Sequence, residues 1–270
     1  MSFFTSLNGL RNAETDLAVI SNNIANSETV GFKRSSAQFA DLVATGGSTD
    51  QLRTPGIGAT VTQIAQDFSL GAFEQSGRGL DVAISGDGFI ATANAVSGDI
   101  TFTRNGSLQI VSSGQLQDAF GDVVQSFPTD AAGNATSTTP GNTTIPLTNA
   151  AGASLTSVTI DSRGIIGAAY TDGTNESVGQ IALAAFSAND GLRAIGGTKY
   201  EATAESGAPT FGEPGVGNFG GLLSGALERS NVDLAEELVG LLIAQRNFQA
   251  NARAIDTNTT ITTTALNLQS

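Results

Sequence analysis

The sequence predicts an α+β protein in which helices at the two ends of the chain flank a mainly antiparallel β domain. Apolar residues recur at steps of three and four near both ends, from Phe3 to Ile24 and from Leu234 to Leu266. Between these stretches, short alternating runs are separated by Gly- and Asn-rich turn signals, which are typical of antiparallel strands. The predicted order is therefore helix, β domain, helix.

The N-terminal helix is predicted from one narrow apolar face. The stretch SNNIAN, residues 21–26, favours termination, because Asn competes for backbone hydrogen bonds and tolerates the left-handed conformation. Gly31 continues the break, so a helix of about 20 to 25 residues is expected. The apolar positions are Phe3, Leu7, Leu10, Ala13, Leu17, Ile20 and Ile24.

The C-terminal helix shows a longer heptad series, which predicts a coiled-coil-type seam. Ser230 or Asn231 is the expected cap. Asp233, Glu236 and Glu237 form a group of carboxylates that could suggest acid–base catalysis, but carboxylates at the positive end of a helix dipole explain them more simply. The series is Leu234, Leu238, Leu241, Gln245, Phe248, Ala252, Ile255, Thr259, Thr262 and Leu266.

The middle of the chain reads as strands and turns. Residues 57–126 contain four short β-type runs, and Arg104-Asn105-Gly106-Ser107 between two of them predicts a hairpin. Residues 129–153 are rich in Thr, Asn, Ala and Gly, which indicates a surface loop or a strand edge. Three more strands are expected after residue 153, with turns at DSRG, residues 161–164, and TDGTN, residues 171–175.

Composition excludes several functions. The chain has 12 basic and 25 acidic residues and a formal charge of −13, which argues against a nucleic-acid-binding surface. It contains no Cys and no His, so Ser-His-Asp triads, Cys nucleophiles and zinc sites built from His or Cys are excluded. No catalytic residue, metal site or cofactor is predicted. No apolar run is long enough to insert into a membrane, and the N-terminus lacks the basic start of a secretory signal.

The pattern predicts three regions. Residues 1–30 and 230–270 form a discontinuous terminal helical core, residues 31–68 a linking bracket, and residues 69–229 the β domain. A heptad stripe usually marks an intramolecular core, but matching stripes at both ends favour assembly with further copies of the chain. Lys33 and Arg34 are expected to be a solvated pair.

Three stretches carry a family resemblance. NNIANSETVGFKRSSAQFADLV, residues 22–43, resembles the N-terminal signature of the bacterial flagellar rod and hook axial proteins. LSGALERSNVDLAEELVGLLIAQRNFQANARAI, residues 223–255, looks like the matching C-terminal signature. DFSLGAFEQSGRGLDVAISGDGFIA, residues 67–91, is similar to the start of the family's β domain. The forms GALERSNVDL and AQRNFQ most resemble hook subunits, here in a short form without the outer domain.

The resemblance implies a structural subunit, not an enzyme, that self-assembles into a bendable hollow tube and transmits motor torque. A rod subunit of the same family is the alternative. The implied partners are further copies of the chain, the rod and hook–filament junction proteins, the hook cap and the flagellar type III export apparatus. The implied location is the extracellular hook or basal body, reached without a cleaved signal peptide. Assembly contacts are expected at Leu7, Leu10, Leu17, Ile24, Asn26, Gly31, Phe32, Phe39, Leu42, Leu234, Leu238, Leu241, Phe248 and Ile255.

Two other classes remain open from the residues alone. A surface adhesin with a helical stalk would use the heptads to form a homotrimer, which sedimentation of the purified chain would detect. An enzyme would show turnover, although no set of residues supports one. Curved tubes would favour a hook subunit and straight tubes a rod subunit.

Overall fold

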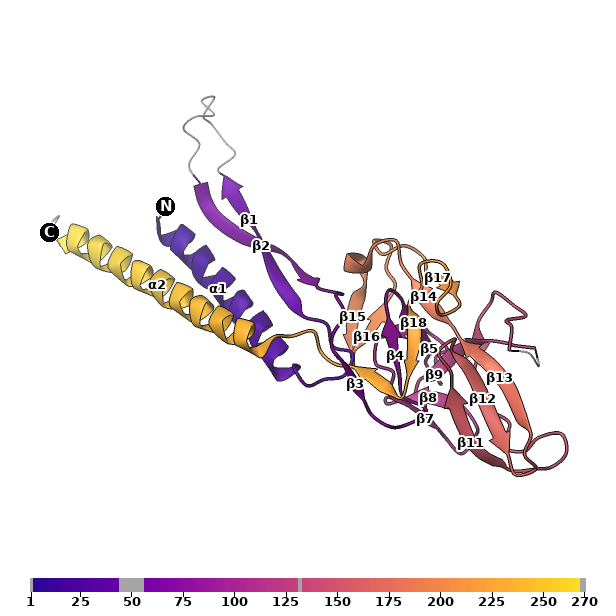
Figure 1. Ribbon diagram of the computed structural model, residues 1–270. Coiled ribbons are helices and arrows are strands. Elements are labelled where there is room, and N and C mark those ends of the chain that lie inside the picture. Colours follow the sequence, from indigo (N-terminus) through magenta and orange to yellow (C-terminus); the bar gives the residue numbers. More distant parts are fainter. Residues whose placement is uncertain (1, 44–55, 131–132, 268–270) are drawn as a thin grey trace. The chain divides into compact units, whose positions relative to one another are not determined.

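The computed structural model describes residues 2–43, 56–130 and 133–267 (Figure 1). It confirms the α+β class, with a helix at each end of the chain and antiparallel strands between them. The chain divides into two compact units. The helical unit comprises Met1–Ser27, Arg34–Asp67 and Val232–Ser270, and the β unit comprises Glu28–Lys33 and Phe68–Asn231.

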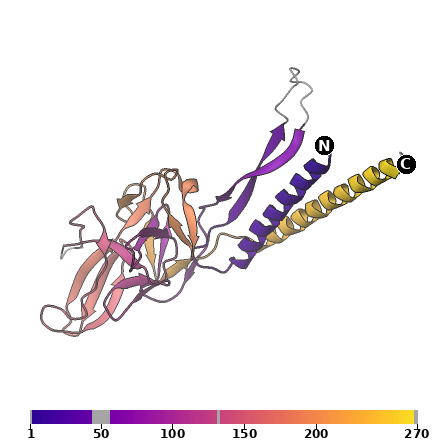
Figure 2. The same cartoon turned by 180° about the vertical axis from the view of Figure 1, so that it is seen from behind.

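The helical unit contains two helices and a hairpin. Helix α1 (Ser2–Ala25) and helix α2 (Leu234–Asn267) run antiparallel and lie side by side from both directions of view (Figures 1 and 2). Strands β1 (Ser35–Val43) and β2 (Gly56–Gln66) pair antiparallel and contact α1. Helix α1 therefore packs against α2 and against the hairpin.

The two helices approach closely where one of them has glycine. A Cβ on Gly9 would lie 2.5 Å from Oδ1 of Asn251, and a Cβ on Gly240 would lie 3.4 Å from Cδ1 of Ile20. Asn23 reaches Glu237 by a hydrogen bond further along the same pair. These three contacts share one antiparallel register, and the absence of side chains at the two glycines permits the close approach.

The β unit is built around one sheet whose strands follow the order β11-β12-β13-β9-β5-β6-β16-β15, with all pairs antiparallel. Strands β18 and β4, and strands β19 and β3, form two further antiparallel pairs. The strands are β3 (Phe73–Gln75), β4 (Val82–Ser85), β5 (Phe89–Ala93), β6 (Ile100–Thr103), β7 (Leu108–Ile110), β8 (Leu116–Asp118), β9 (Val123–Phe127), β10 (Gly141–Asn142), β11 (Leu155–Ile160), β12 (Ile165–Tyr170), β13 (Asn175–Ile181), β14 (Leu183–Ala185), β15 (Arg193–Gly196), β16 (Lys199–Glu201), β17 (Thr210–Gly212), β18 (Gly221–Ser224) and β19 (Ala226–Glu228), with a 3-10 turn at Asn189–Gly191.

The core of the β unit has an aliphatic part and an aromatic part. Strand β12 alternates between half-buried and buried residues, as expected for a strand with one face on the core, whereas β5 and β9 are buried throughout. The aromatic part contains Phe89, Phe102 and Tyr200. The aliphatic part contains Val82, Ile84, Ile90, Leu108, Leu116, Val124, Ile145, Ile160, Ile166, Ala168, Tyr170, Ile181, Leu183 and Leu222.

A five-residue turn that begins with Asp or Asn and has glycine fourth recurs in this unit. In Asp161–Ile165, the Asp161 carboxylate accepts hydrogen bonds from the amides of Arg163 and Ile165, and Gly164 adopts φ +76°. The same side-chain pattern closes Asn149–Ala153 and Asp118–Asp122. This arrangement joins β11 to β12, so the turn predicted at DSRG is confirmed.

The hairpin predicted at Arg104–Ser107 is wrong. Strand β6 pairs with β5 and β16, while β7 pairs with β8, so the strands on either side of this turn are not partners. Gly106 is needed for another reason, since a Cβ there would lie 1.6 Å from the carbonyl oxygen of Val82. The Asn-Gly signal therefore marks a tight turn into a packed interior instead of a two-stranded hairpin.

Candidate assembly surfaces and buried polar networks

Asp233 begins α2. Its carboxylate accepts hydrogen bonds from the amides of Ala235 at 2.8 Å and Glu236 at 3.3 Å, the geometry of an N-cap. The predicted caps are therefore wrong. Asn231 instead donates its amide to the Ser69 hydroxyl and carbonyl, within the β unit.

The predicted heptad stripe of α2 is covered unequally along its length. Leu241 and Ile255 are half-buried, and Ala244, which lies between them, is fully buried. Leu234 and Leu238 are 43% and 51% exposed. Because the apolar residues at the start of α2 occupy more than one face, a single stripe does not describe them.

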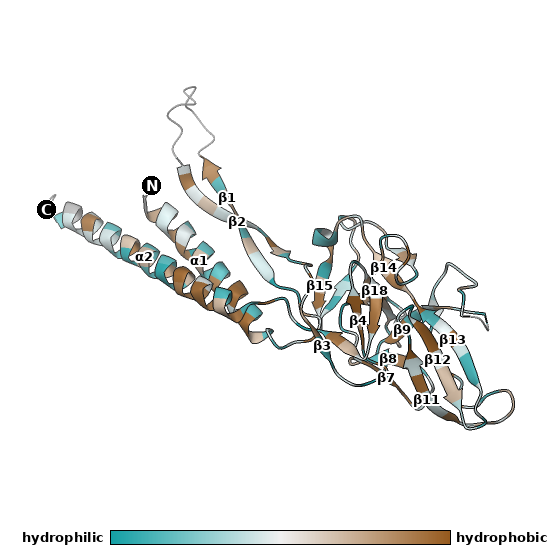
Figure 3. Ribbon diagram, viewed as in Figure 1, coloured by the Kyte–Doolittle hydropathy of each residue, from teal (hydrophilic) through white to brown (hydrophobic). Residues whose placement is uncertain are grey.

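A patch that we name the outer apolar face lies along the first turns of α2. It consists of Leu238, Val239, Leu242 and Ile243, each more than half exposed. Figure 3 shows the apolar colouring concentrated in this part of α2, with paler and polar residues toward its C-terminal end. Four large apolar side chains so close together on a helix surface are typical of a surface that binds another protein.

The predicted positions of α1 are largely covered. Leu7, Leu10, Leu17 and Ile24 are half-buried, and the fully buried apolar residues are Ala13, Val19 and Ile20. Val19 lies outside the predicted stripe, because α1 contacts the hairpin as well as α2 and so buries a second face. At the end of the helix, Asn26 donates its side-chain amide to the carbonyl of Asn22 at 2.9 Å.

The predicted bracket positions fall in both units. Phe39 is 44% exposed on β1 and Leu42 is half-buried, whereas Gly31 and Phe32 belong to the β unit. Phe39 also lines a small pocket of the helical unit together with Gly9, Asn12, Ala13, Asp16, Asn247 and Asn251. Phe248 on α2 is 37% exposed.

Gly31 has a conformation that only glycine adopts easily. Its φ is +71°, and a Cβ would lie 2.6 Å from the backbone nitrogen of Asn105. Its amide donates to the carbonyl of Glu228 at 2.8 Å. The glycine therefore lets the backbone before Lys33 lie directly against two other segments of the β unit.

Lys33 is buried, and the expectation of a solvated pair is wrong for it. Its ammonium lies 2.6 Å from the Glu228 carboxylate, and both side chains are fully buried. Glu228 also accepts from the amide of Gly71 at 3.0 Å and from Arg104 at 3.4 Å, and Lys33 donates to the carbonyl of Ser69 at 2.6 Å. We name Lys33, Arg104 and Glu228 the Glu228 node.

The Glu228 node holds two cations and one carboxylate away from water. Burial lowers the pKa of Arg104, and the charge of Glu228 opposes that effect. The Arg104 guanidinium also lies 5.1 Å from the centre of the Phe89 ring, a cation–π contact. Because such groups are stable inside a protein only with partners, the node fixes three separate segments of the β unit against one another.

A second polar network lies in the helical unit. Asn23 is 1% exposed and donates to the carbonyl of Ser35 and to Glu237. Arg34 pairs with Glu236 at 3.0 Å and with Glu237 at 3.8 Å, so it is not simply solvated either. The two glutamates therefore do more than complement the dipole of α2.

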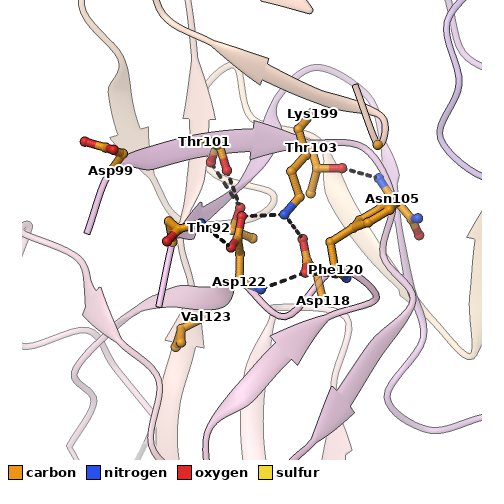
Figure 4. A network of polar contacts seen from close by, with 12 residues as sticks. Thr92, Asp99, Thr101, Thr103, Asn105, Asp118, Phe120, Asp122, Val123 and Lys199 are labelled. Carbon is orange, nitrogen blue, oxygen red and sulfur yellow. Dashed lines mark hydrogen bonds and ion pairs between the residues drawn. The ribbon is translucent and has the colours of Figure 1, made fainter. Parts of the chain in front are cut away.

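A third network surrounds Lys199 on β16 (Figure 4). Its ammonium lies between the carboxylates of Asp118, at 2.8 Å, and Asp122, and 5.2 Å from the centre of the Phe120 ring. Asn94 donates to the other oxygen of Asp122 at 3.1 Å. Each charge in this network has an opposite partner, which is the arrangement of a structural ion pair.

The described residues contain no cluster of three or more side chains of the kinds that bind a metal ion. In the same part of the chain, no helix is both long enough and apolar enough to cross a membrane.

Comparison with known proteins decides the family. The profile "Flagella basal body rod protein" matches residues 4–33, "Flagellar hook protein FlgE/F/G D1 domain" matches residues 83–168, and "Flagellar basal body rod FlgEFG protein C-terminal" matches residues 223–268. The flagellar basal-body rod protein FlgG of Bacillus subtilis is 35% identical over 288 aligned positions, which cover 99% of this chain and 98% of that protein. The chain belongs to the flagellar rod and hook protein family.

The relatives of this chain include both rod proteins and hook proteins. The flagellar hook protein FlgE of Salmonella typhimurium is 28% identical over 411 aligned positions, with all of both chains covered. The basal-body rod protein FlgG of Caulobacter vibrioides is 34% identical over 267 positions, which cover 94% of this chain and 93% of that protein. Membership confirms the resemblance predicted from the terminal motifs and makes the chain a structural subunit of the flagellar rod or hook, not an enzyme.

Proposed function

We propose that the chain is a hook subunit that polymerises with further copies of itself into a bendable hollow tube. The observation that carries this proposal is the outer apolar face, which remains exposed although α1 already covers the opposite side of α2. The hook assignment is supported by the motifs GALERSNVDL and AQRNFQ, which most resemble those of hook subunits.

The outer apolar face is the proposed main contact between copies, and Leu234 extends it toward the start of α2. Burying one such side chain fully contributes about 1.5–3 kcal/mol, and these side chains are about half exposed in the single chain. Four of them therefore supply several kcal/mol per contact. In this proposal the face on α2 meets a different surface of the neighbouring copy, and such a heterologous contact generates an open helical assembly.

Other predicted positions have secondary roles in this proposal. Phe39 offers an exposed aromatic ring on the hairpin, and Leu42 follows three positions later on the same strand. The half-buried predicted positions of α1, and Leu241 and Ile255 of α2, would stabilise the packing of the two helices within the helical unit. Residues 31–68 would then act as the bracket that joins the two units.

A substitution within the outer apolar face tests the proposal. Leu242→Asp places a charge among its apolar neighbours, so we expect seeded growth of tubes to stop while the subunit still folds. Thr262→Asp adds the same charge at an exposed position on the opposite side of the same helix, and that variant should polymerise normally. Light scattering and electron microscopy measure growth, and helical circular dichroism measures folding. Normal tubes from Leu242→Asp would refute the role of this face.

A rod subunit is the second candidate function. The specific observation in its favour is the alignment length: rod protein FlgG aligns over 288 positions, close to the 270 residues of this chain, whereas hook protein FlgE aligns over 411. Curved tubes from the purified chain support the hook, and straight tubes support the rod. In cells, loss of the gene should leave rods without hooks if the chain is a hook subunit.

The same proposal includes the location and the partners. The subunit would be exported by the flagellar type III apparatus without cleavage of its N-terminus and would lie outside the cell. It would contact the rod, the hook cap during growth and the hook–filament junction proteins. Mass determination of the subunit from sheared tubes tests the export route, since an intact N-terminus is expected.

A further inference from the structure

The side chain of Asn23 contacts two other elements of the helical unit. Its amide donates to the carbonyl of Ser35 at 2.8 Å and to the carboxylate of Glu237 at 3.2 Å, and its oxygen accepts from the amide of Ser35 at 3.0 Å. Asn23 belongs to α1, Ser35 begins β1, and Glu237 lies in the first turns of α2. One buried amide therefore joins both helices and the base of the hairpin.

Arg34 strengthens the same junction from the surface. Its guanidinium lies 3.0 Å from Glu236 and 3.8 Å from Glu237, and its side chain is 28% exposed. The backbone of the same residue accepts a hydrogen bond from the amide of Asp67 at 2.8 Å, where the hairpin ends. Both strands of the hairpin are thus held at their base, close to Asn23.

The hydrogen bonds of Asn23 can form together in only one arrangement. A buried amide is stable when its donors and acceptor are paired, and a shifted hairpin or helix would leave them unpaired. Away from this junction the hairpin has a hydrogen bond to α1 from the Asn12 side chain to the carbonyl of Ala59 at 2.8 Å, while the described residues of β1 and β2 are exposed or half-buried. Asn23 thus ties the base of the hairpin to both helices, whereas Asn12 holds the hairpin to α1 alone.

We propose that Asn23 is a positioning residue that fixes the direction in which the β1–β2 hairpin leaves the helix pair. It thereby selects the surface that the hairpin presents to a neighbouring copy. This role is that of a single buried polar residue that specifies one packing among several. The inference rests on the proposed polymerisation, because a fixed hairpin matters for function only where copies meet.

Amide hydrogen exchange in the free, full-length subunit tests the positioning role. In Asn23→Leu, we expect the hairpin amides of residues 35–43 and 56–66 to exchange on the order of ten- to a hundredfold faster. The amides at the α1–α2 contact should keep their protection, because leucine adds apolar contact there. Asn22→Leu is the matched control, because Asn22 is the exposed residue next to Asn23 in α1. In that variant the hairpin amides should exchange at the wild-type rate.

A second pair of variants separates positioning from simple loss of packing. Asn23→Asp keeps the acceptor for the Ser35 amide but sets two carboxylates against each other, so it should also release the hairpin. Adding Glu237→Gln supplies an amide donor to that aspartate and should restore part of the protection. Tubes of Asn23→Leu should vary in diameter or curvature, whereas those of Asn22→Leu should be uniform.

Unchanged hairpin exchange in Asn23→Leu would overturn the inference, as would the lack of any rescue in the double variant. If α1 and α2 lose protection as well, Asn23 supports the fold as a whole and the positioning role is again overturned. Exchange in the free subunit does not depend on polymerisation. A wild-type chain that forms no tubes would therefore refute the proposed function and leave this measurement intact.

Discussion

Replacing single members of the Glu228 node should destabilise the β unit in a defined order. The node carries two positive charges and one negative charge, all buried. Glu228→Gln leaves Lys33 and Arg104 without a counter-charge. Lys33→Met leaves the ion pair of Arg104 and Glu228, which has no net charge and a nitrogen–oxygen distance of 3.4 Å. Arg104→Met leaves the ion pair of Lys33 and Glu228, with the shorter distance of 2.6 Å. We expect the loss of stability to fall in that order.

The magnitudes follow from the burial and the distances. Breaking a buried ion pair by removing one partner costs about 3–5 kcal/mol, so Glu228→Gln should lie at or above the upper end and Lys33→Met near the lower end. Arg104→Met should cost about 1–2 kcal/mol, mainly through its contact with the Phe89 ring and its weaker pairing. Since whole domains are stable by about 5–15 kcal/mol, the first variant should be close to unfolding.

The chain offers a spectroscopic probe for the β unit alone. It has no Trp and two Tyr, and both Tyr170 and Tyr200 are buried in the β unit. Urea unfolding followed by tyrosine fluorescence therefore reports this unit, while circular dichroism at the helical band follows mainly the helical unit. Treating the two signals separately avoids assuming a single transition for the whole chain.

Arg163→Met is the control for charge removal at the surface. Its side chain is 64% exposed and lies 3.5 Å from Asp161, so its loss should change the free energy of unfolding by less than about 1 kcal/mol. If the free energies of unfolding of Lys33→Met and Glu228→Gln also lie within about 1 kcal/mol of the wild type, the Glu228 node does not stabilise the β unit. A larger effect of Arg104→Met than of Glu228→Gln would contradict the charge argument itself.

Three further predictions concern turns, a cap and acidity. Gly164→Ala should destabilise the β unit more than Gly173→Ala by tyrosine-monitored unfolding, because both glycines have positive φ but a Cβ on Gly164 would lie 2.9 Å from Pro214 while the site of Gly173 is open. Asp233→Ala should reduce the stability of the helical unit by about 1 kcal/mol, measured by thermal loss of the helical signal. A hydrogen bond from the Thr174 side chain holds the pKa of Asp172 below its usual value, so this residue stabilises the fold above the unfolded pKa of about 3.9, and that contribution is lost as the pH falls through the lower, folded pKa. Asp172→Asn should therefore flatten the acid limb of the pH–stability profile.

The order of elements and many turns were predictable from local sequence. The first helix ends at Ala25, inside the stretch SNNIAN of residues 21–26, and the turn at Asp161–Gly164 closes with its own side chain and glycine. Such features depend on residues within five positions of one another, and a sequence displays them directly. The terminal motifs indicated the family for the same reason, since each is a continuous stretch.

Several parts of the candidate site could not be predicted locally. Lys33 and Arg34 resemble an ordinary solvated pair, yet Lys33 meets Glu228, which lies 195 positions away. The local sequence at Asn23 predicts a helix stop, yet the partners of its side chain include Glu237, 214 positions away. The hairpin expected at Asn105 fails because Arg104 is drawn into the Glu228 node and β7 pairs elsewhere. No signal in a single sequence distinguishes these residues from their exposed neighbours.

By itself, the sequence determined which segments are helices, which are strands, where several turns fall and which family the chain resembles. Only the tertiary structure decided which charges are buried, and which face of α2 is covered by α1 and which is left exposed. The physical reason is that periodicity records that a residue is apolar but not what lies opposite it. Leu238 and Leu241 belong to one heptad series, yet the partners brought in by the fold cover them unequally.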